Sequence, residues 1–281
     1  MGIRLIIDSA SDISPEEAKK QGMILLSQSI RFGDEEFRDA VELTHREFYQ
    51  RLEQSNELPT TSQINPGVYG AVLKKIAAEG DEAIIITMSS KLSGTHQSAV
   101  IAAQEYEDRA YVVDSENVCV GERILIQLAL GLRDQGLSAR EIVERLNEEK
   151  KKIRVIALLD TLEYLKKGGR ISATVAFAGS LLSIKPVVAV EQGAVALVGK
   201  ARGSKQGNNL LRQLIEKTGV DFEKPFALAY SGLSDELLRK YISDSEDLWM
   251  GHTNALPIST VGCTIGTHVG PGAVAVAFFE P

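Results

Sequence analysis

The feature that most constrains this chain is the alternation of short apolar runs with capped helical segments. Residues 3–7 form an apolar run, and Ser14-Pro15-Glu16-Glu17 then combines an N-cap serine, a first-turn proline and a glutamate that can reach back. The apolar runs 83–88 and 110–113 are also followed by helical patterns. Such strand–helix units build a mainly parallel sheet flanked by helices, so the first half predicts an α/β domain.

The second half shows a different strand pattern. Residues 186–190 and 194–198 are apolar runs separated by Glu191-Gln192-Gly193, which predicts a β-hairpin and hence a mixed sheet. Between the halves lies a charged run over residues 148–152, which a solvated helix end explains as well as a domain boundary does. With the boundary placed there, we expect two α/β domains, residues 1–152 and 153–281.

Three segments carry individual expectations. Residues 23–30 predict one strand, and residues 172–182 predict a helix rich in small residues. The C-terminal stretch predicts two strands, residues 258–264 and 273–279, joined by a glycine-rich loop at 266–272.

Composition excludes several classes of protein. The 281 residues are 44% hydrophobic, which is ample for a core, and carry a formal charge of −7. This balance argues against a broad surface for nucleic acid or anionic membrane. Asp8 interrupts the first apolar run before it reaches signal-peptide length, and no run approaches the roughly 18 residues of a membrane span.

The cysteines and histidines do not predict a metal site. Cys119 and Cys263 stand alone in apolar surroundings, and the four histidines are scattered without metal-ligand spacing. Single buried thiols are typical of a reducing cytosol. We therefore expect a soluble, cytoplasmic protein with no bound metal.

Three segments concentrate hydroxyl groups and glycine, namely residues 59–63, 89–98 and 266–272, the last of which contains His268. Ligands of parallel α/β sheets bind beyond the carboxyl ends of strands, where the second segment lies. Amide groups at a helix start favour an anion, and hydroxyls add neutral donors. Each segment taken alone is more often explained by helix capping or an ordinary turn than by ligand binding.

Taken together, the motifs resemble the DegV family over essentially the whole chain. The resemblance rests on Asp8-Ser9 with Asp12, residues 59–63 with Pro66, residues 89–95 with 97–99, residues 113–115 and 162–171, Lys185-Pro186, residues 200–202, and residues 266–272.

The resemblance implies two α/β domains with a long-chain fatty acid, such as palmitate or oleate, in a buried tunnel between them. Members of the FakB type deliver this acid to a separate kinase subunit, which phosphorylates the carboxylate to an acyl phosphate for phospholipid synthesis. A protein of this kind is a non-catalytic carrier without a cofactor, and transient membrane contact fits that role. The residues expected to contact the carboxylate are Thr61, Ser62, Ser93, Gly94, Thr95 and His268.

Two further expectations follow from the resemblance. Arg170 and Arg202 match basic positions near the carboxylate end, where they would order the loops or meet the kinase. Residues 173–182 are expected to supply tunnel wall, although an ordinary core helix explains them as well. A basic rim for the kinase would contain Lys166, Lys167, Arg170, Lys200 and Arg202, for which a solvated surface is the alternative.

Two enzyme classes compete with the carrier. A serine hydrolase would use Ser93, His268 and an acid such as Asp114 or Asp160, but Leu92-Ser93-Gly94 lacks the Gly-x-Ser-x-Gly elbow. A phosphotransferase would carry phosphate on His268 or the Ser93 segment. That segment lacks the Gly-Lys-Ser/Thr ending of a P-loop.

Overall fold

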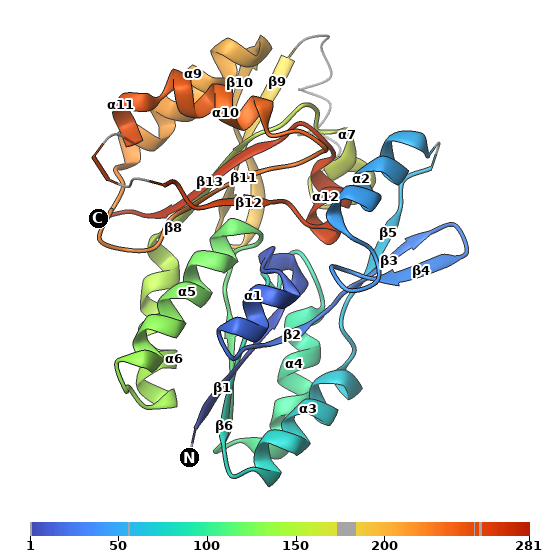
Figure 1. The fold of residues 1–281 in the computed structure, drawn as a ribbon, viewed down its shortest axis with the longest axis vertical. Coiled ribbons are helices and arrows are strands. Elements are labelled where there is room, and N and C mark those ends of the chain that lie inside the picture. Colours follow the sequence, from blue (N-terminus) through green and yellow to red (C-terminus); the bar gives the residue numbers. More distant parts are fainter. Residues whose placement is uncertain (1, 56, 173–183, 250, 253–254) are drawn as a thin grey trace.

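A parallel four-stranded sheet forms the centre of the N-terminal half (Figure 1). The computed structural model describes residues 2–55, 57–172, 184–249, 251–252 and 255–281. Neighbouring strands of this sheet all pair in parallel, as the sequence predicts. Their order is β2 (Ile24–Leu26), β1 (Ile3–Asp8), β6 (Glu82–Thr87) and β7 (Ala110–Asp114).

Helices cover both faces of this sheet because its strands are apolar on both sides. Leu5 and Ile7 pack in one hydrophobic cluster, whereas Ile6 packs in another, as the alternation of strand side chains requires. One face is covered by α3 (Pro66–Ala78) and α4 (Thr95–Ala103), and the other by α1 (Pro15–Lys20), α5 (Val120–Asp134) and α6 (Ala139–Glu149). Short 3-10 turns lie at Ser9–Ser11, Gln104–Tyr106 and Lys150–Lys152.

The C-terminal half contains a mixed six-stranded sheet, as the hairpin predicts. Its order is β10 (Ala194–Arg202), β9 (Ile184–Glu191), β8 (Ile153–Leu158), β13 (Val274–Phe279), β11 (Ala227–Tyr230) and β12 (Ile258–Thr260). β11 and β12 pair in parallel, and the other neighbours pair antiparallel. Its outer face carries α9 (Gly203–Thr218) and α10 (Glu236–Asp244), followed by α11 (Glu246–Trp249). Its first strand along the chain, β8, begins directly after the charged run at residues 148–152.

A third, three-stranded sheet corrects the prediction for residues 23–30. These residues do not form one strand, because the chain leaves β2 and enters β3 (Ser29–Phe32), which pairs with β4 (Glu35–Arg38) and β5 (Thr60–Ser62). At the change of sheet, the buried Gln28 side chain donates to the Asp8 carboxylate. The small sheet and α2 (His45–Gln54) project beside the C-terminal half (Figure 1).

The glycine-rich segment near the C-terminus is also corrected. Residues 263–269 form the helix α12 (Cys263–Val269), so the expected loop is largely helical and the expected strand ends early, at Thr260. Carboxylates from distant segments cap this helix, and local sequence patterns carry no sign of such partners. The helix expected at residues 172–182 lies almost entirely outside the described residues.

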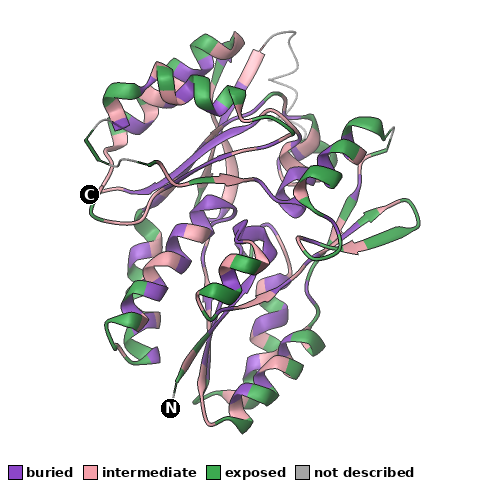
Figure 2. Cartoon of the chain, in the orientation of Figure 1, coloured by how far each residue is buried: buried purple, intermediate pink, exposed green. Residues whose placement is uncertain are grey.

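The two halves share a hydrophobic core. α5 packs on the parallel sheet through residues such as Ile124 and also against the inner face of the C-terminal sheet, where Ala275 and Ala277 belong to the same cluster. Figure 2 shows this shared interior as buried strands between helices whose outer sides are exposed. Among the described residues, no helix is both long and apolar enough to cross a bilayer.

Candidate functional site

A cavity of about 170 Å³ lies where the two halves and the small sheet meet. Its polar lining comes from the β3–β5 region, the loop after β6, the segment after α7 (Glu163–Lys167) and α12. The lining residues are Gln28, Thr61, Ser62, Gln63, Met88, Leu92, Ser93, Gly94, Val118, Leu165, Arg170, Val195, Thr264, Ile265, His268 and Val269. The cavity therefore brings together residues of all three hydroxyl- and glycine-rich segments.

Thr61 and His268 form the closest contact between two of these segments. The Oγ1 of Thr61 lies 3.0 Å from the Nε2 of His268, although the two residues are 207 positions apart in sequence. Thr61 is the partly buried residue of β5, between the exposed Thr60 and Ser62. Strand alternation turns its hydroxyl towards α12.

His268 is held as a neutral imidazole. Burial, together with the nearby positive charge of Arg170, lowers its pKa to about 4. Its Nδ1 is buried and has no hydrogen-bond partner among the described residues. The ring packs closely on Gly168, where a Cβ atom would lie 2.2 Å from Nδ1. At neutral pH this ring offers one N–H donor and no positive charge.

The loop before α4 supplies a second group of hydroxyls. The backbone N–H of Thr95 donates to the Ser93 Oγ at 3.2 Å, and the two hydroxyl oxygens lie 3.0 Å apart. Ser93 and Gly94 line the cavity, whereas Thr95 is fully buried behind them. Thr95 therefore orients Ser93, a division of roles that the sequence could not resolve.

The two predicted arginines lie in different places. Arg170 lines the cavity, and its guanidinium donates to the backbone oxygens of Leu92 and Gly168 at 3.1 and 2.7 Å. This arginine therefore ties the Ser93 loop to the His268 side of the cavity. Arg202 is exposed at the end of β10, outside the cavity lining.

A second, nonpolar cavity of about 60 Å³ continues from the first. It lies between the inner face of the C-terminal sheet and the N-terminal half. The two cavities share the lining residues Val118, Leu165, Val195, Ile265 and Val269. The second cavity adds Cys119, Val155, Ala157, Leu159, Val188, Ala189, Val190, Val261, Ala273 and Ala275.

These wall residues are mostly ones that the sequence did not single out. The wall predicted from residues 173–182 lies outside the described residues. Val155, Ala157 and Leu159 instead line the cavity from β8 and the residue that follows it, at a spacing of two that matches one face of a strand. The sequence shows this spacing, but it does not show which face of the strand borders a cavity, because that depends on how the two halves pack. Gln28, Gln63 and Thr264 were missed for the same reason.

The geometry does not form the catalytic triad of the hydrolase alternative. The hydrogen bonds recorded for the Ser93 hydroxyl run to Thr95, and no described carboxylate bonds to Nδ1 of His268. The two candidate acids have other partners. Asp114 accepts from the backbone N–H groups of Ser90 and Glu116, and Asp160 pairs with Lys185.

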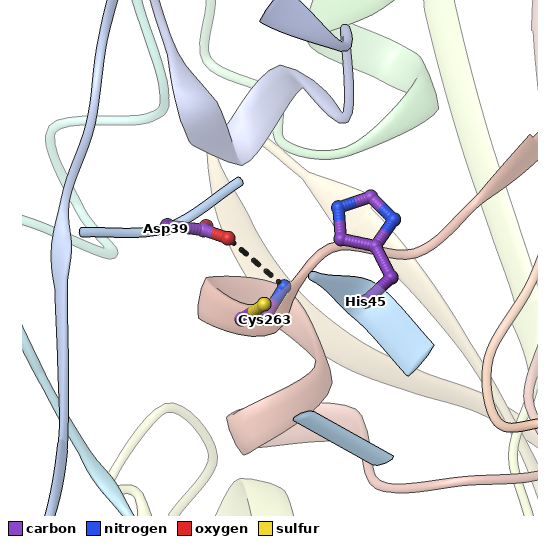
Figure 3. A group of neighbouring side chains, drawn as sticks. All are labelled: Asp39, His45 and Cys263. Carbon is purple, nitrogen blue, oxygen red and sulfur yellow. Dashed lines mark hydrogen bonds between the residues drawn. The ribbon is translucent and has the colours of Figure 1, made fainter. Parts of the chain in front are cut away.

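Asp39 links the small sheet to the start of α12 (Figure 3). Its carboxylate accepts the backbone N–H groups of Cys263 and Thr264 at 3.2 and 3.1 Å, and the Thr264 hydroxyl at 2.6 Å. Asp12 accepts the N–H of Gly262 at 2.8 Å. Two buried carboxylates from the N-terminal half therefore cap the helix that carries His268.

Asp39, His45 and Cys263 are the described residues whose ligand atoms lie close enough to hold a metal ion, all within 4.8 Å of one another. Asp39 already accepts three hydrogen bonds there, and the positive end of α12 disfavours a cation. Burial also raises the pKa of the Cys263 thiol, which keeps it protonated. Helix capping explains this group, and we assign no metal to it.

Further carboxyl groups are buried where the two halves meet. Burial raises the pKa of Asp8 to about 6 and that of Asp12 to about 7, and it raises the pKa of Glu122 well above its ordinary value. Arg123 lies close by, donating to the backbone oxygen of Asp12 at 3.0 Å and pairing with Glu17 at 2.6 Å. The region therefore retains protons near neutral pH.

Comparison with known proteins identifies the family. The model of the DegV family, described as a family of uncharacterised proteins, matches residues 2–281. A DegV domain-containing protein of Caldanaerobacter subterraneus subsp. tengcongensis is 32% identical over 280 residues, which cover 99% of each chain.

Two solved structures resemble this one closely. A DegV family protein from Thermus thermophilus, described as fatty acid binding, is 30% identical with a TM-score of 0.89 and full coverage of both chains. DegV of Bacillus subtilis, described as a fatty acid binding protein, is also 30% identical, with a TM-score of 0.85 and full coverage of both. With the family model matching nearly its whole length, the chain belongs to the DegV family.

Proposed function

We propose that this protein binds one long-chain fatty acid, with the carboxylate in the polar cavity and the acyl chain in the nonpolar cavity behind it. The observation that carries the proposal is the continuity of the two cavities, one lined by hydroxyls and His268 and the other by nonpolar side chains. The fatty-acid-binding relatives of the same fold support it.

The polar end suits a carboxylate. Burying this group without partners would cost several kcal/mol, so its water shell must be replaced. Thr61, Ser93 and the neutral His268 offer donors there, and Arg170 adds a positive charge already held by backbone oxygens. Hydrogen bonds to a charged group contribute about 1.5–3 kcal/mol each, so a few of them offset the desolvation.

The nonpolar end supplies affinity. Each buried CH₂ group contributes about 0.8 kcal/mol, so a long chain enclosed by valine, leucine and alanine side chains binds tightly without further polar contacts. In this proposal the protein carries the fatty acid and does not hydrolyse an acyl ester, because the described residues of the site do not form the triad that acyl hydrolysis needs.

Neighbouring threonines on β5 allow a matched test. Thr61→Val keeps the shape of the side chain and removes the hydroxyl that meets His268, so oleate affinity should fall about tenfold. Thr60→Val changes an exposed residue outside the cavity lining and should leave affinity unchanged. Displacement of a fluorescent fatty acid measures the affinity of each variant for oleate. Equal affinities would show that the carboxylate does not bind beside Thr61.

We further propose that the bound acid is presented to a separate kinase subunit, which phosphorylates it in the cytoplasm. The support is the family resemblance, together with the basic residues of the predicted rim. Lys166 and Arg202 are exposed, whereas Lys167 pairs with Glu163 at 2.6 Å. Free, buried Cys119 and Cys263 fit a reducing compartment.

Arg202 gives the cleaner test of kinase docking, because Arg170 belongs to the cavity lining. Arg202→Glu should retain oleate binding and lower acyl-phosphate formation at least tenfold when a DegV-coupled kinase subunit is supplied. Arg140→Glu, at an exposed residue of α6 outside the cavity lining, serves as the control for a change of charge alone. Unchanged acyl-phosphate formation in Arg202→Glu would place the docking surface elsewhere.

A further inference from the structure

The polar cavity reaches the surface beside β5. Of the described residues that line it, Ser62 and Gln63 are the exposed ones, whereas the others are buried or partly buried. A residue that both lines a cavity and meets solvent lies where the cavity opens. Ser62 ends β5 and Gln63 follows it directly, so Thr61, which meets His268, lies next to this opening.

The side chain of Gln63 extends from the end of β5 to the start of α4. Its amide nitrogen donates to the Oγ of Ser98, a buried residue of α4, at 3.0 Å. The amide group also lies on Gly94, where a Cβ atom would be 2.0 Å from Oε1. This close approach is possible because residue 94 has no side chain. Gln63 thus bridges the strand that carries Thr61 and the loop that carries Ser93.

The loop before α4 has anchors other than Gln63. The backbone oxygen of Leu92 accepts from Arg170 at 3.1 Å. The backbone N–H of Ser93 donates to the backbone oxygen of Ser89 at 3.2 Å. Gln63 itself is held on α4 by one neutral hydrogen bond, and loss of such a bond shifts an equilibrium by only about two- to tenfold. The side chain can therefore rotate away from α4 while the cavity wall stays in place.

We propose that Gln63 covers the carboxylate end of the site and controls access to the bound carboxylate from this side. The inference rests on the proposed fatty-acid binding and adds the residue that separates the ligand from solvent. In the position seen here, the amide keeps water from the carboxylate, which strengthens the hydrogen bonds that Thr61 and His268 make to it. A subunit that reaches the carboxylate between β5 and α4 must first displace this side chain.

Oleate labelled with ¹³C at its carboxyl carbon reports how exposed the bound carboxylate is. A soluble, neutral gadolinium chelate accelerates the NMR relaxation of this carbon more strongly the closer it approaches. Gln63→Ala removes the cover, and Ser98→Ala removes the hydroxyl that holds it. Gln97→Ala is the matched control, because Gln97 is an exposed residue of α4 outside the cavity lining. All variants are compared at saturating oleate, so that differences in affinity do not affect the result.

Ser98→Ala should raise the relaxation enhancement about twofold or more, because the open position of Gln63 becomes more populated. Gln63→Ala should raise it at least as much, the double variant no further than Gln63→Ala, and Gln97→Ala not at all.

An unchanged enhancement in Gln63→Ala, an equal rise in Gln97→Ala, or a further rise in the double variant would overturn the assignment. If the unsubstituted protein gives no signal from bound carboxyl carbon, the proposed function fails instead. Melting curves check the fold of each variant. Gln63 is exposed, so Gln63→Ala decides even if Ser98→Ala does not fold.

Discussion

At the scale of single residues, the site depends on a neutral histidine held in one orientation. Nε2 of His268 meets Thr61, and the other side of the ring packs on Gly168 without room for a Cβ. The low pKa follows from burial, so the imidazole acts through hydrogen bonding at neutral pH. Small changes beside the ring should therefore affect binding without removing any ligand-contacting group.

Gly168→Ala should weaken oleate binding about tenfold, because the new methyl group would lie on Nδ1 and displace the ring from Thr61. Gly169→Ala is its control. Gly169 has open space around it but a φ of 72°, so alanine there should cost about 1 kcal/mol of stability and leave affinity unchanged. Calorimetric titration with oleate measures the affinity of the two variants. Equal affinities would show that the position of the His268 ring does not affect binding.

At the scale of elements, α12 is positioned by carboxylates from elsewhere in the chain. Asp39 bonds the first residues of the helix, and Thr264 joins this cap to the cavity lining. The seven-residue helix is too short to be stable by itself, so its position depends on these partners.

Asp39→Ala should lower the free energy of unfolding by about 3–5 kcal/mol, because three buried donors lose their acceptor. Asp39→Asn keeps one oxygen acceptor and should therefore lower the free energy of unfolding by less than Asp39→Ala does. Glu42→Ala, three residues away, removes an exposed pair with Arg38 and should cost at most about 1 kcal/mol. Urea denaturation compares the three, and similar losses for Asp39→Ala and Glu42→Ala would show that the cap adds no stability.

The same helix shows which parts of the structure a sequence can predict. Parallel strands and the β9–β10 hairpin follow from local patterns of period two and from turn residues, and both are confirmed. The sequence predicts the end of a strand and a loop where α12 lies, because the residues that cap this helix, Asp12 and Asp39, are more than 200 positions away. Only the family resemblance could predict that Thr61 and His268 lie in one site, because no local sequence pattern pairs residues so far apart.

At the scale of the whole molecule, the halves meet around carboxyl groups that hold protons. The raised pKa values of Asp8 and Asp12 mean that the folded state binds more protons than the unfolded state above about pH 4. Their contribution to stability is therefore complete below that pH and is lost as the pH rises through about 6 to 7. His268 acts in the opposite direction, since its lowered pKa makes stability fall as the pH drops from about 6.5 towards 4.

Asp12→Asn separates these effects. The variant keeps an oxygen to accept the N–H of Gly262 but has no proton to lose, so its stability relative to the natural protein should rise by about 2–3 kcal/mol between about pH 5 and pH 8. Asp235→Asn, at the N-cap of α10 where the partly exposed carboxylate pairs with Arg239, should show no such gain. If the difference in stability between Asp12→Asn and the natural protein did not change with pH, Asp12 would be ionised over this whole pH range.

The central claim is that the joined cavities hold a fatty acid, and native mass spectrometry of the protein purified from a bacterial host tests it most directly. We expect a one-to-one mass excess that lipid extraction resolves into one or two long-chain fatty acids, and its loss when Ser93→Ala is combined with His268→Ala in a protein that still folds. A protein that carries no lipid and takes up neither oleate nor palmitate when these are added would contradict the account.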